Sequence, residues 1–281
     1  MTDNSTGTRS TGNDPVAIDS TVPHPSRIYD YLLGGTDNFE VDRAAAQRAG
    51  DDVGGMENAR HDIRSNRSFL GWAVRHLAGD LGIRQFLDLG TGIPNADNVH
   101  GVAQSVAPDS RIVYVDNDPV VLAQSHNLLH STAEGATAYL DGDLRDPQAV
   151  LQAASATIDF ERPVAVMLVA VLHLLRDEED DPQAIVPQLV DALAPGSYVV
   201  ITHLAKDIEA EQMARMSHRV NETMRGTLVL RTRPEVAAFF EGLEMVPPGV
   251  VPVDEWPDYD GKPTPPAGRT TPYYVGIGRK P

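Results

Sequence analysis

The chain has 281 residues, no cysteine, and 40 acidic against 23 basic side chains, which gives a formal net charge of −17. A surface this acidic disfavours nucleic acids and anionic membranes as partners, and the lack of cysteine excludes disulfides, thiolate metal sites and cysteine nucleophiles. The longest apolar run, over 164–175, is shorter than the ~20 residues that cross a bilayer, and the polar N-terminus does not resemble a secretory signal. We therefore expect a globular cytoplasmic protein.

The N-terminal part is expected to be helical after a disordered tail. Residues 1–22 consist mostly of Ser, Thr, Gly, Asn and Asp and have little to bury, which predicts the tail. Helical patterns then cover three stretches, 26–33, 43–49 and 57–82. Ser26 is expected to cap the first helix, and Gly34-Gly35 to end it. The third stretch is long and amphipathic.

Short apolar runs alternate with helical stretches in the middle of the chain. The expected strands are 85–89, 111–115, 137–140, 164–170 and 197–202, followed by helices within 207–224 and 232–243 and a last strand over 273–278. Three helices open on Asp-Pro, at Asp118, Asp146 and Asp181, since Asp caps free N–H groups and Pro suits the first helical position. Near-continuous apolar strands separated by helices predict an α/β fold with a parallel sheet covered on both faces.

The most informative motif follows the first strand. Gly90-Thr91-Gly92 allows a tight turn against which a ligand can lie. The third glycine of the dinucleotide fingerprint is absent, because position 95 is Asn. Asp88, shortly before the glycines, would repel a pyrophosphate but suits an ammonium or sulfonium group. The motif predicts a nucleotide-type cofactor with a positive charge, bound at the carboxyl edge of the sheet.

Two further acids end the next two strands. Asp116, followed by Asn117, lies where a carboxylate accepts hydrogen bonds from ribose hydroxyls. Asp143 follows the third strand and suits an adenine amino group, with Leu144 against the ring. For each acid alone, a helix cap or a loop position is the more common role. Three acids at successive strand ends, Asp88 included, predict a single cofactor site.

Several segments resemble a known family. FLDLGTG, VDNDPVVLAQ and DGDLRD resemble the glycine, strand-two and adenine motifs of class I S-adenosylmethionine (SAM)-dependent methyltransferases. More narrowly, SRIYDYLLGGTDNFEVDRAAA, ARHDIRSNRSFL and LAPGSYVVITH resemble the actinobacterial S-adenosyl methyltransferase family once described as DUF574. This likeness covers nearly everything from residue 23 onward. It implies a doubly wound Rossmann-like sheet of seven strands in the order 3-2-1-4-5-7-6, the last one antiparallel, with SAM as the cofactor.

The resemblance also implies site residues. SAM would lie over Asp88, Gly90, Gly92, Asp116 and Asp143. The hallmark of the family is the segment before the sheet, so we expect one domain, made of a helical cap over 23–80 and a Rossmann-like core over 81–281. The cap would place Arg27, Tyr29 and Gly35 on the cofactor, with Arg27 at the methionine carboxylate. The alternative for this segment is an ordinary N-terminal helix packed on the sheet.

Methyl transfer needs little acid–base help. Positioning supplies most of the acceleration, and a base is needed only where the acceptor loses a proton. His173 and His203 follow the fourth and fifth strands, where such folds place acceptor-side groups, and they are the candidate catalytic residues. A structural role is the alternative for His173. His126 and His130 are four apart but lack the glutamate of a zinc-protease motif, so we expect no metal.

The leading hypothesis is a SAM-dependent methyltransferase that acts on a small molecule, with the cap and residues 205–270 enclosing the acceptor. The Pro-rich loop around Trp256 is expected either to line the acceptor or to lie on the surface. One alternative is an enzyme that transfers the aminocarboxypropyl arm of SAM or cyclises SAM, and another is a non-catalytic SAM-sensing regulator. The sequence leaves open the acceptor, the use of a base and the oligomeric state.

Overall fold

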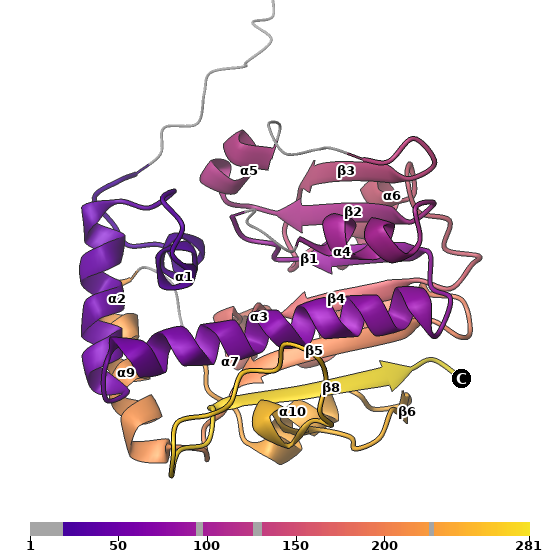
Figure 1. The fold of residues 1–281 in the computed structure, drawn as a ribbon. Helices are drawn as coiled ribbons and strands as arrows, with labels where there is room; N and C mark the ends of the chain where they lie inside the picture. The colour runs from indigo at the N-terminus through magenta and orange to yellow at the C-terminus, as the bar shows by residue number, and fades with distance from the viewer. Residues whose placement is uncertain (1–18, 94–97, 126–130, 225–227) are drawn as a thin grey trace, which may run out of the picture.

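The computed structural model describes residues 19–93, 98–125, 131–224 and 228–281. A single central sheet lies between two layers of helices (Figure 1). Most of the expected tail, and the pair His126 and His130, lie outside the described residues. Within those residues, no helix has both the length and the apolar character needed to cross a membrane.

The sheet follows the order β3-β2-β1-β4-β5-β8-β6. Its long strands are β1 (Gln85–Leu89), β2 (Arg111–Asp116), β3 (Ala136–Asp141), β4 (Ala165–Val169), β5 (Tyr198–Leu204) and β8 (Tyr273–Arg279). Strands β1 to β5 pair in parallel, and β8 is antiparallel to β5. This confirms the expected order and the antiparallel last strand. Two short strands, β6 (Glu244–Met245) and β7 (Val251–Pro252), also pair with β8, and β7 adds an eighth strand to the seven expected.

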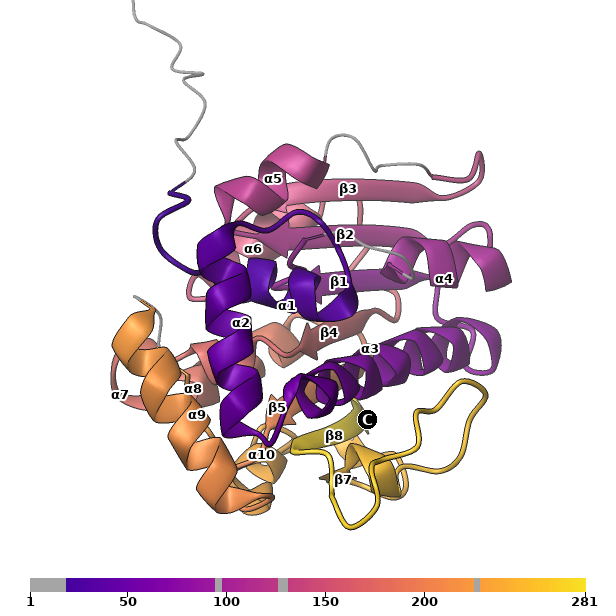
Figure 2. The same ribbon diagram turned by 60° about the vertical axis from the view of Figure 1, so that its left-hand side comes forward.

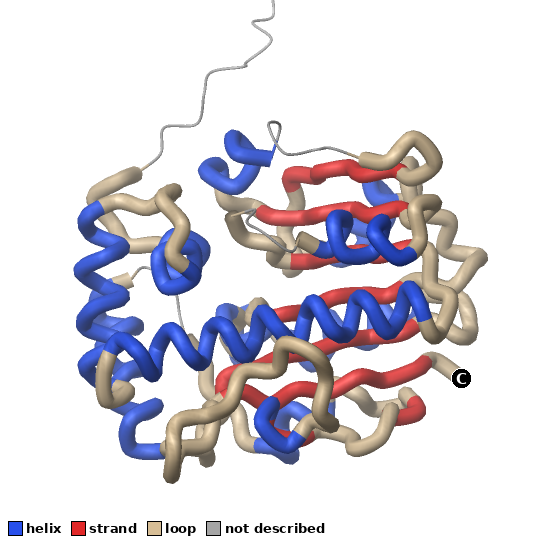
Figure 3. Tube along the Cα trace, viewed as in Figure 1, coloured by secondary structure: helices blue, strands red, loops and turns tan. Residues whose placement is uncertain are grey.

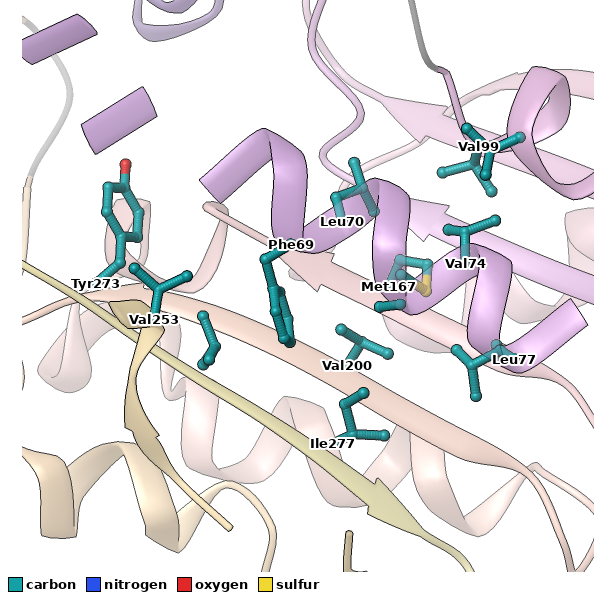
Figure 4. Packing of buried hydrophobic residues seen from close by; sticks show 14 of the residues in the cluster. Phe69, Leu70, Val74, Leu77, Val99, Met167, Val200, Val253, Tyr273 and Ile277 are labelled. Atoms are coloured by element: carbon teal, nitrogen blue, oxygen red, sulfur yellow. The ribbon is translucent and has the colours of Figure 1, made fainter. Parts of the chain in front are cut away.

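Both faces of the sheet are buried, which explains why its strands are apolar almost without interruption. On one face, helices α3 (Met56–Gly79) and α4 (Val99–Val106) cover alternate strand residues such as Phe86, Met167 and Val200. Figure 4 shows Phe69 and Leu77 of α3 pointing onto this face. On the other face, residues such as Leu87, Val166 and Ile201 pack against α6 (Pro147–Ala154), α8 (Pro182–Asp191) and α10 (Arg233–Ala238). The tube in Figure 3 shows these two helical layers on either side of the strands.

The Asp-Pro sequences begin helices as expected. The side chains of Asp118, Asp146 and Asp181 each accept a hydrogen bond from a backbone N–H in the first turn of α5 (Pro119–Ser125), α6 and α8. Thr232 opens α10 with a capping box to Glu235. A four-residue helix, α7 (Asp177–Asp180), precedes α8. Because these caps are local, sequence reasoning places them correctly.

The N-terminal helices are α1 (Pro25–Leu33), α2 (Glu40–Asp52) and the long α3. Gly34 ends α1 in a left-handed conformation with φ of 90°, as expected. The expected cap at Ser26 is wrong, because α1 begins at Pro25 and leaves Ser26 inside its first turn. Proline has no N–H to satisfy and a φ already suited to a helix, so it takes the first position.

Helices α1 and α2 lie beyond the carboxyl ends of the parallel strands, and α2 runs beside α9 (Ala210–Thr223), as Figure 2 shows. A two-pronged ion pair joins α2 to α9. The Nε and Nη2 atoms of Arg219 lie 2.6 and 3.0 Å from the two carboxylate oxygens of Asp52. These helices therefore wall off the edge of the sheet where the loops after β1, β2 and β4 emerge.

The core on the α3 face gives a stability prediction. Phe69 is fully buried, and its ring centroid lies 5.1 Å from that of Trp256. We expect Phe69→Ala to lower the free energy of unfolding by about 3–5 kcal/mol, because it leaves a cavity among large side chains. Val106→Ala, at a position 41% exposed, should change it by less than about 0.5 kcal/mol. Urea unfolding followed by circular dichroism measures both, and equal effects would contradict the placement of Phe69.

Candidate functional site

A cavity of about 740 Å³ opens at the carboxyl edge of the sheet. Parallel strands end at the same edge, so the loops after β1, β2, β3 and β4 all reach it. Helices α1, α2, α3 and α9 supply most of the remaining wall. The cavity gathers His173 and every expected cofactor residue except Gly35: Arg27, Tyr29, Asp88, Gly90, Thr91, Gly92, Asp116, Asn117, Asp143 and Leu144.

The loop after β1 turns tightly on its two glycines. Gly90 and Gly92 have φ angles of 72° and 67°, a region that other residues rarely adopt. A Cβ atom at Gly90 would overlap the side chain of Val171. Thr91 closes the turn by donating from its hydroxyl to the Asp88 carbonyl at 3.1 Å. Glycine is thus required at Gly90 by both backbone conformation and space.

Asp88 places a buried carboxyl group in the wall of the cavity. Its side chain belongs to β1, and the residue is only 6% exposed. Burial raises the pKa of Asp88 to about 7, an effect that the charge of Arg67 opposes and that of Asp116 adds to. Among the described residues, none donates a hydrogen bond to this carboxylate. A buried carboxylate without a donor in its own protein is costly unless a ligand supplies the positive charge or the donor.

Asp116 is held rigidly at the end of β2. One carboxylate oxygen accepts the N–H of Gly92 at 2.8 Å, and the other accepts the N–H of Asp118 at 2.9 Å. Burial raises the pKa of Asp116, and these two N–H donors oppose the rise. Each oxygen keeps a lone pair for a further donor. The arrangement fits a pair of neighbouring hydroxyl groups.

Asp143 sits at the third strand end and is already engaged. Its carboxylate accepts from the backbone N–H and the Nη1 of Arg145, at 2.9 and 3.0 Å, and from the side-chain amide of Asn117 at 3.3 Å. Arg145 also pairs with Asp180 at 2.9 Å. Leu144 is buried beside them in the cavity wall. The expected contact of Asp143 with an adenine amino group remains a prediction.

Arg27 and Gly35 make their close contacts within the N-terminal segment, residues 19–42. The guanidinium of Arg27 donates to Asp42 at 2.8 Å and to the carbonyl groups of Asp19 and Val22. Gly35 lies outside the cavity lining, and a Cβ atom there would overlap the carboxylate of Asp30. Roles for Arg27 and Gly35 on the cofactor therefore stay predictions, and the contacts made by Arg27 give it a structural role.

Asp42 of α2 ties this segment together. Its fully buried carboxylate accepts from Arg27, from the backbone N–H of His24 at 2.9 Å and from that of Phe39 at 2.8 Å. His24 then reaches the opposite wall, where its Nδ1 lies 2.9 Å from Asp118. The sequence does not reveal this contact, because the Asp-Pro pattern at Asp118 predicts a helix cap alone. One oxygen of Asp118 caps α5 and the other faces His24.

Tyr29 also lines the cavity, and its hydroxyl accepts a hydrogen bond from the Asn66 amide at 3.0 Å. Burial raises the pKa of Tyr29. Arg67 lines the cavity as well, one turn of α3 further on from Ile63. The Tyr29 hydroxyl is therefore protonated and neutral.

His173 lies directly after β4, in a short 3₁₀ turn over Leu172–Leu174. It is 6% exposed and lines the cavity, and its buried Nδ1 has no hydrogen-bond partner among the described residues. Burial lowers the pKa of His173 well below its ordinary value, and nearby His203 and Arg231 add to the effect. The imidazole is therefore neutral at physiological pH.

His203 is packed behind His173 and outside the cavity lining, with 5.5 Å between ring centroids. Its Nδ1–H donates to the Leu204 carbonyl at 2.8 Å, which leaves Nε2 to accept from Arg231 at 2.7 Å. Burial lowers the pKa of His203 to about 3, against the opposing effect of the Leu204 carbonyl. Both ring nitrogens are in use, so this geometry supports a positioning role and gives no support to direct catalysis.

The wall that α1, α2, α3 and α9 contribute, which we call the acceptor half, is mainly apolar. It includes Ile28, Leu32, Ala45, Val53, Ile63, Met213, Met216 and Val220, beside the charged Arg48, Asp62, Arg67 and Arg219. Asp62 of α3 also lines the cavity, and its carboxylate accepts hydrogen bonds from both Nη atoms of Arg269. The two residues are 207 positions apart, so the sequence does not reveal this contact. Burial raises the pKa of Asp62 to about 6, against the attraction of Arg269. Trp256 does not line the cavity and is instead 2% exposed in the core.

No metal centre is visible in the part of the chain that the structure describes, since no three His, Asp or Glu side chains there could hold an ion together.

Comparison with known proteins identifies the family. The sequence matches the S-adenosyl methyltransferase family over residues 11–281. A DUF574 family protein from Streptomyces avermitilis has 41% identity and a TM-score of 0.86, over 94% of this chain and 99% of the other. A protein from Thermobifida fusca has 41% identity and a TM-score of 0.81, over 93% of this chain and 96% of the other. No curated protein matches.

A more distant structure, of an O-methyltransferase family protein from Burkholderia thailandensis, has 18% identity and a TM-score of 0.50, over 86% of this chain and 62% of the other. It is similar in fold alone. The two 41% identical structures and the family match confirm the resemblance carried by the glycine, strand-two and adenine motifs. The chain belongs to the S-adenosyl methyltransferase family, whose cofactor is S-adenosylmethionine.

Proposed function

We propose that the protein transfers the methyl group of SAM to a small molecule held in the same cavity. The observation that carries this proposal is the buried Asp88 carboxylate, which faces the cavity with no donor from the described residues. It supplies the negative charge that the ammonium or sulfonium group of SAM calls for. Asp116 would accept the ribose hydroxyls with its two fixed oxygens, and Leu144 would lie against the adenine ring.

The other residues around the cavity would position the acceptor and accept its proton. SAM supplies a methyl group that is already activated by its sulfonium, so the protein needs chiefly to align the acceptor and exclude water. Helices α1, α2 and α9 line the acceptor side. His173, neutral and lining the same cavity, accepts the proton of an acceptor hydroxyl or N–H group as the new bond forms.

Two other uses of SAM compete with this proposal. Transfer of the aminocarboxypropyl arm, or cyclisation of SAM, needs the same cofactor contacts, and a SAM-sensing regulator needs no acceptor cavity. A cavity that continues past the cofactor residues to His173 favours an acceptor. Incubation with SAM and a fractionated small-molecule extract, followed by mass spectrometry, should show one metabolite gaining the mass of one methylene group, together with S-adenosylhomocysteine. A larger adduct, or a cofactor consumed without any acceptor, would favour the competing reactions.

Removing the Asp116 carboxylate should weaken SAM binding. Hydrogen bonds to a charged group contribute about 1.5–3 kcal/mol each, so we expect Asp116→Ala to raise the dissociation constant for SAM by about 10- to 100-fold or more. Asp159→Asn is the matched control, because the exposed Asp159 is bonded to Gln85 at the start of β1, the end of that strand opposite to the cavity. Isothermal titration calorimetry measures both. Unchanged affinity in Asp116→Ala would refute the ribose assignment.

The raised pKa of Asp88 predicts a pH dependence. Below pH about 7 the free protein holds this carboxyl group protonated and neutral. A cationic ligand binds better to the charged form, so SAM affinity should rise as pH increases through about 7 and then level off. Titration of SAM itself contributes equally to wild type and Asp88→Asn, so the difference between their pH profiles isolates Asp88. Superimposable profiles from pH 5.5 to 8.5 would contradict the role of Asp88.

His173→Gln should slow methyl transfer without weakening cofactor binding. Loss of a general base typically costs about 10²–10⁴-fold in rate, whereas SAM affinity should stay within about twofold because His173 faces the acceptor half. His218→Gln, on the exposed face of α9, is the control. The rate is measured on the acceptor that the extract experiment identifies. A His173→Gln enzyme as fast as wild type would leave His173 with a structural role only.

A further inference from the structure

The acceptor half of the cavity is specific enough in its chemistry to indicate a class of acceptor. We propose that the acceptor is an uncharged, largely apolar molecule with one hydroxyl or N–H group, its body lying between α2 and α9 and its protic group at His173. This inference rests on the proposed methyl transfer and names the substrate class for the same site.

The wall between α2 and α9 is hydrophobic and adaptable. Met213 and Met216 lie three positions apart on one face of α9 and line the cavity, and Met224 follows the helix. Leu32 of α1 and Val53 at the end of α2 belong to the same hydrophobic cluster. Methionine side chains are flexible and polarisable and fit irregular apolar surfaces. Such a wall favours rings or alkyl chains and offers few hydrogen bonds to a polar body.

The buried carboxylates at this wall are already paired inside the protein. Asp62 pairs with Arg269, and Asp52 of α2 pairs with the exposed Arg219 of α9. A charged acceptor body would lose its hydration here without gaining a buried partner of opposite sign among the described residues. Arg48 of α2 is an exposed residue that also lines the cavity, and in the described part of α2 and α9 it is the one lining cation that pairs with no acid. An anionic acceptor would bind there.

His173 indicates where the reactive group lies. His173 lines the cavity, and no described residue donates a hydrogen bond to its ring, so the part of the ring that reaches the cavity is open to a hydroxyl or N–H group of a ligand. Tyr273 lies close by, with ring centroids 6.5 Å apart, and Figure 4 shows its hydroxyl pointing away from the hydrophobic cluster. The acceptor oxygen or nitrogen bonds to the methyl carbon, the carbon–sulfur bond breaks with its electron pair going to sulfur, and the acceptor proton passes to the imidazole.

The test uses binding of a probe in the absence of SAM. The probe is 2-naphthol, an apolar bicycle with one hydroxyl, and its charged analogues are 2-naphthoate and 2-naphthylmethylammonium. Fluorescence titration of the full chain should give the tightest binding for 2-naphthol. Met216→Glu should weaken that binding by about tenfold or more, because it sets a carboxylate in the apolar wall.

Three matched measurements keep the outcome interpretable. Met216→Leu preserves an apolar side chain of similar size and should stay within about twofold of wild type. Ala214→Glu adds the same charge to α9 at an exposed position outside the cavity lining and should also bind normally. SAM affinity, measured by calorimetry on each variant, should remain unchanged.

Two results would overturn the inference. The first is tighter binding of 2-naphthoate than of 2-naphthol, with the preference abolished in Arg48→Gln, which would assign an anionic acceptor. The second is equal 2-naphthol binding in Met216→Glu and wild type, which would place the acceptor elsewhere. If either occurs while SAM still binds, only the substrate class fails. Loss of SAM binding by the wild-type protein would instead refute the proposed function.

Discussion

The parallel pairing of β1 with β2 on one side and β4 on the other determines where everything else in the site can lie. Asp88 is in register with Tyr114 of β2 and Met167 of β4, so all three strands end within a few residues of the same level. The glycine turn, the loop of Asp116 and the turn of His173 therefore emerge together. A change of register by one residue would turn Asp88 away from the cavity and bring a core side chain into it.

Local signals in the sequence account for much of the fold and for the cofactor half of the site. Apolar runs bounded by Asp-Pro and Gly-x-Gly specify strands, caps and turns over a few residues. The ends of β1, β2 and β3 each carry an acid next to the motif that reveals it. Ser26 shows the limit of such reasoning, since Ser and Pro side by side both favour a helix start and only one can hold the first position.

The acceptor half could not be predicted because it is assembled from distant contacts. Asp62 meets Arg269 across 207 positions, and Asp52 meets Arg219 across 167. Met213 and Met216 follow an ordinary amphipathic pattern, which indicates a buried face but not whether that face meets another helix or a ligand. His203 shows the same limit, because its pattern predicts a site residue and only the positions of Leu204 and Arg231 reveal that both nitrogens are engaged.

The buried carboxylate of Asp42 has a consequence for how the two ligands affect each other. It fixes the segment of His24, which reaches Asp118 on the cofactor side, to α2, which walls the acceptor side. In the proposed arrangement, the segment would contact SAM and the helix would contact the acceptor. A displacement of α2 on acceptor binding would then change SAM affinity, and by thermodynamic linkage SAM would change acceptor affinity by the same factor.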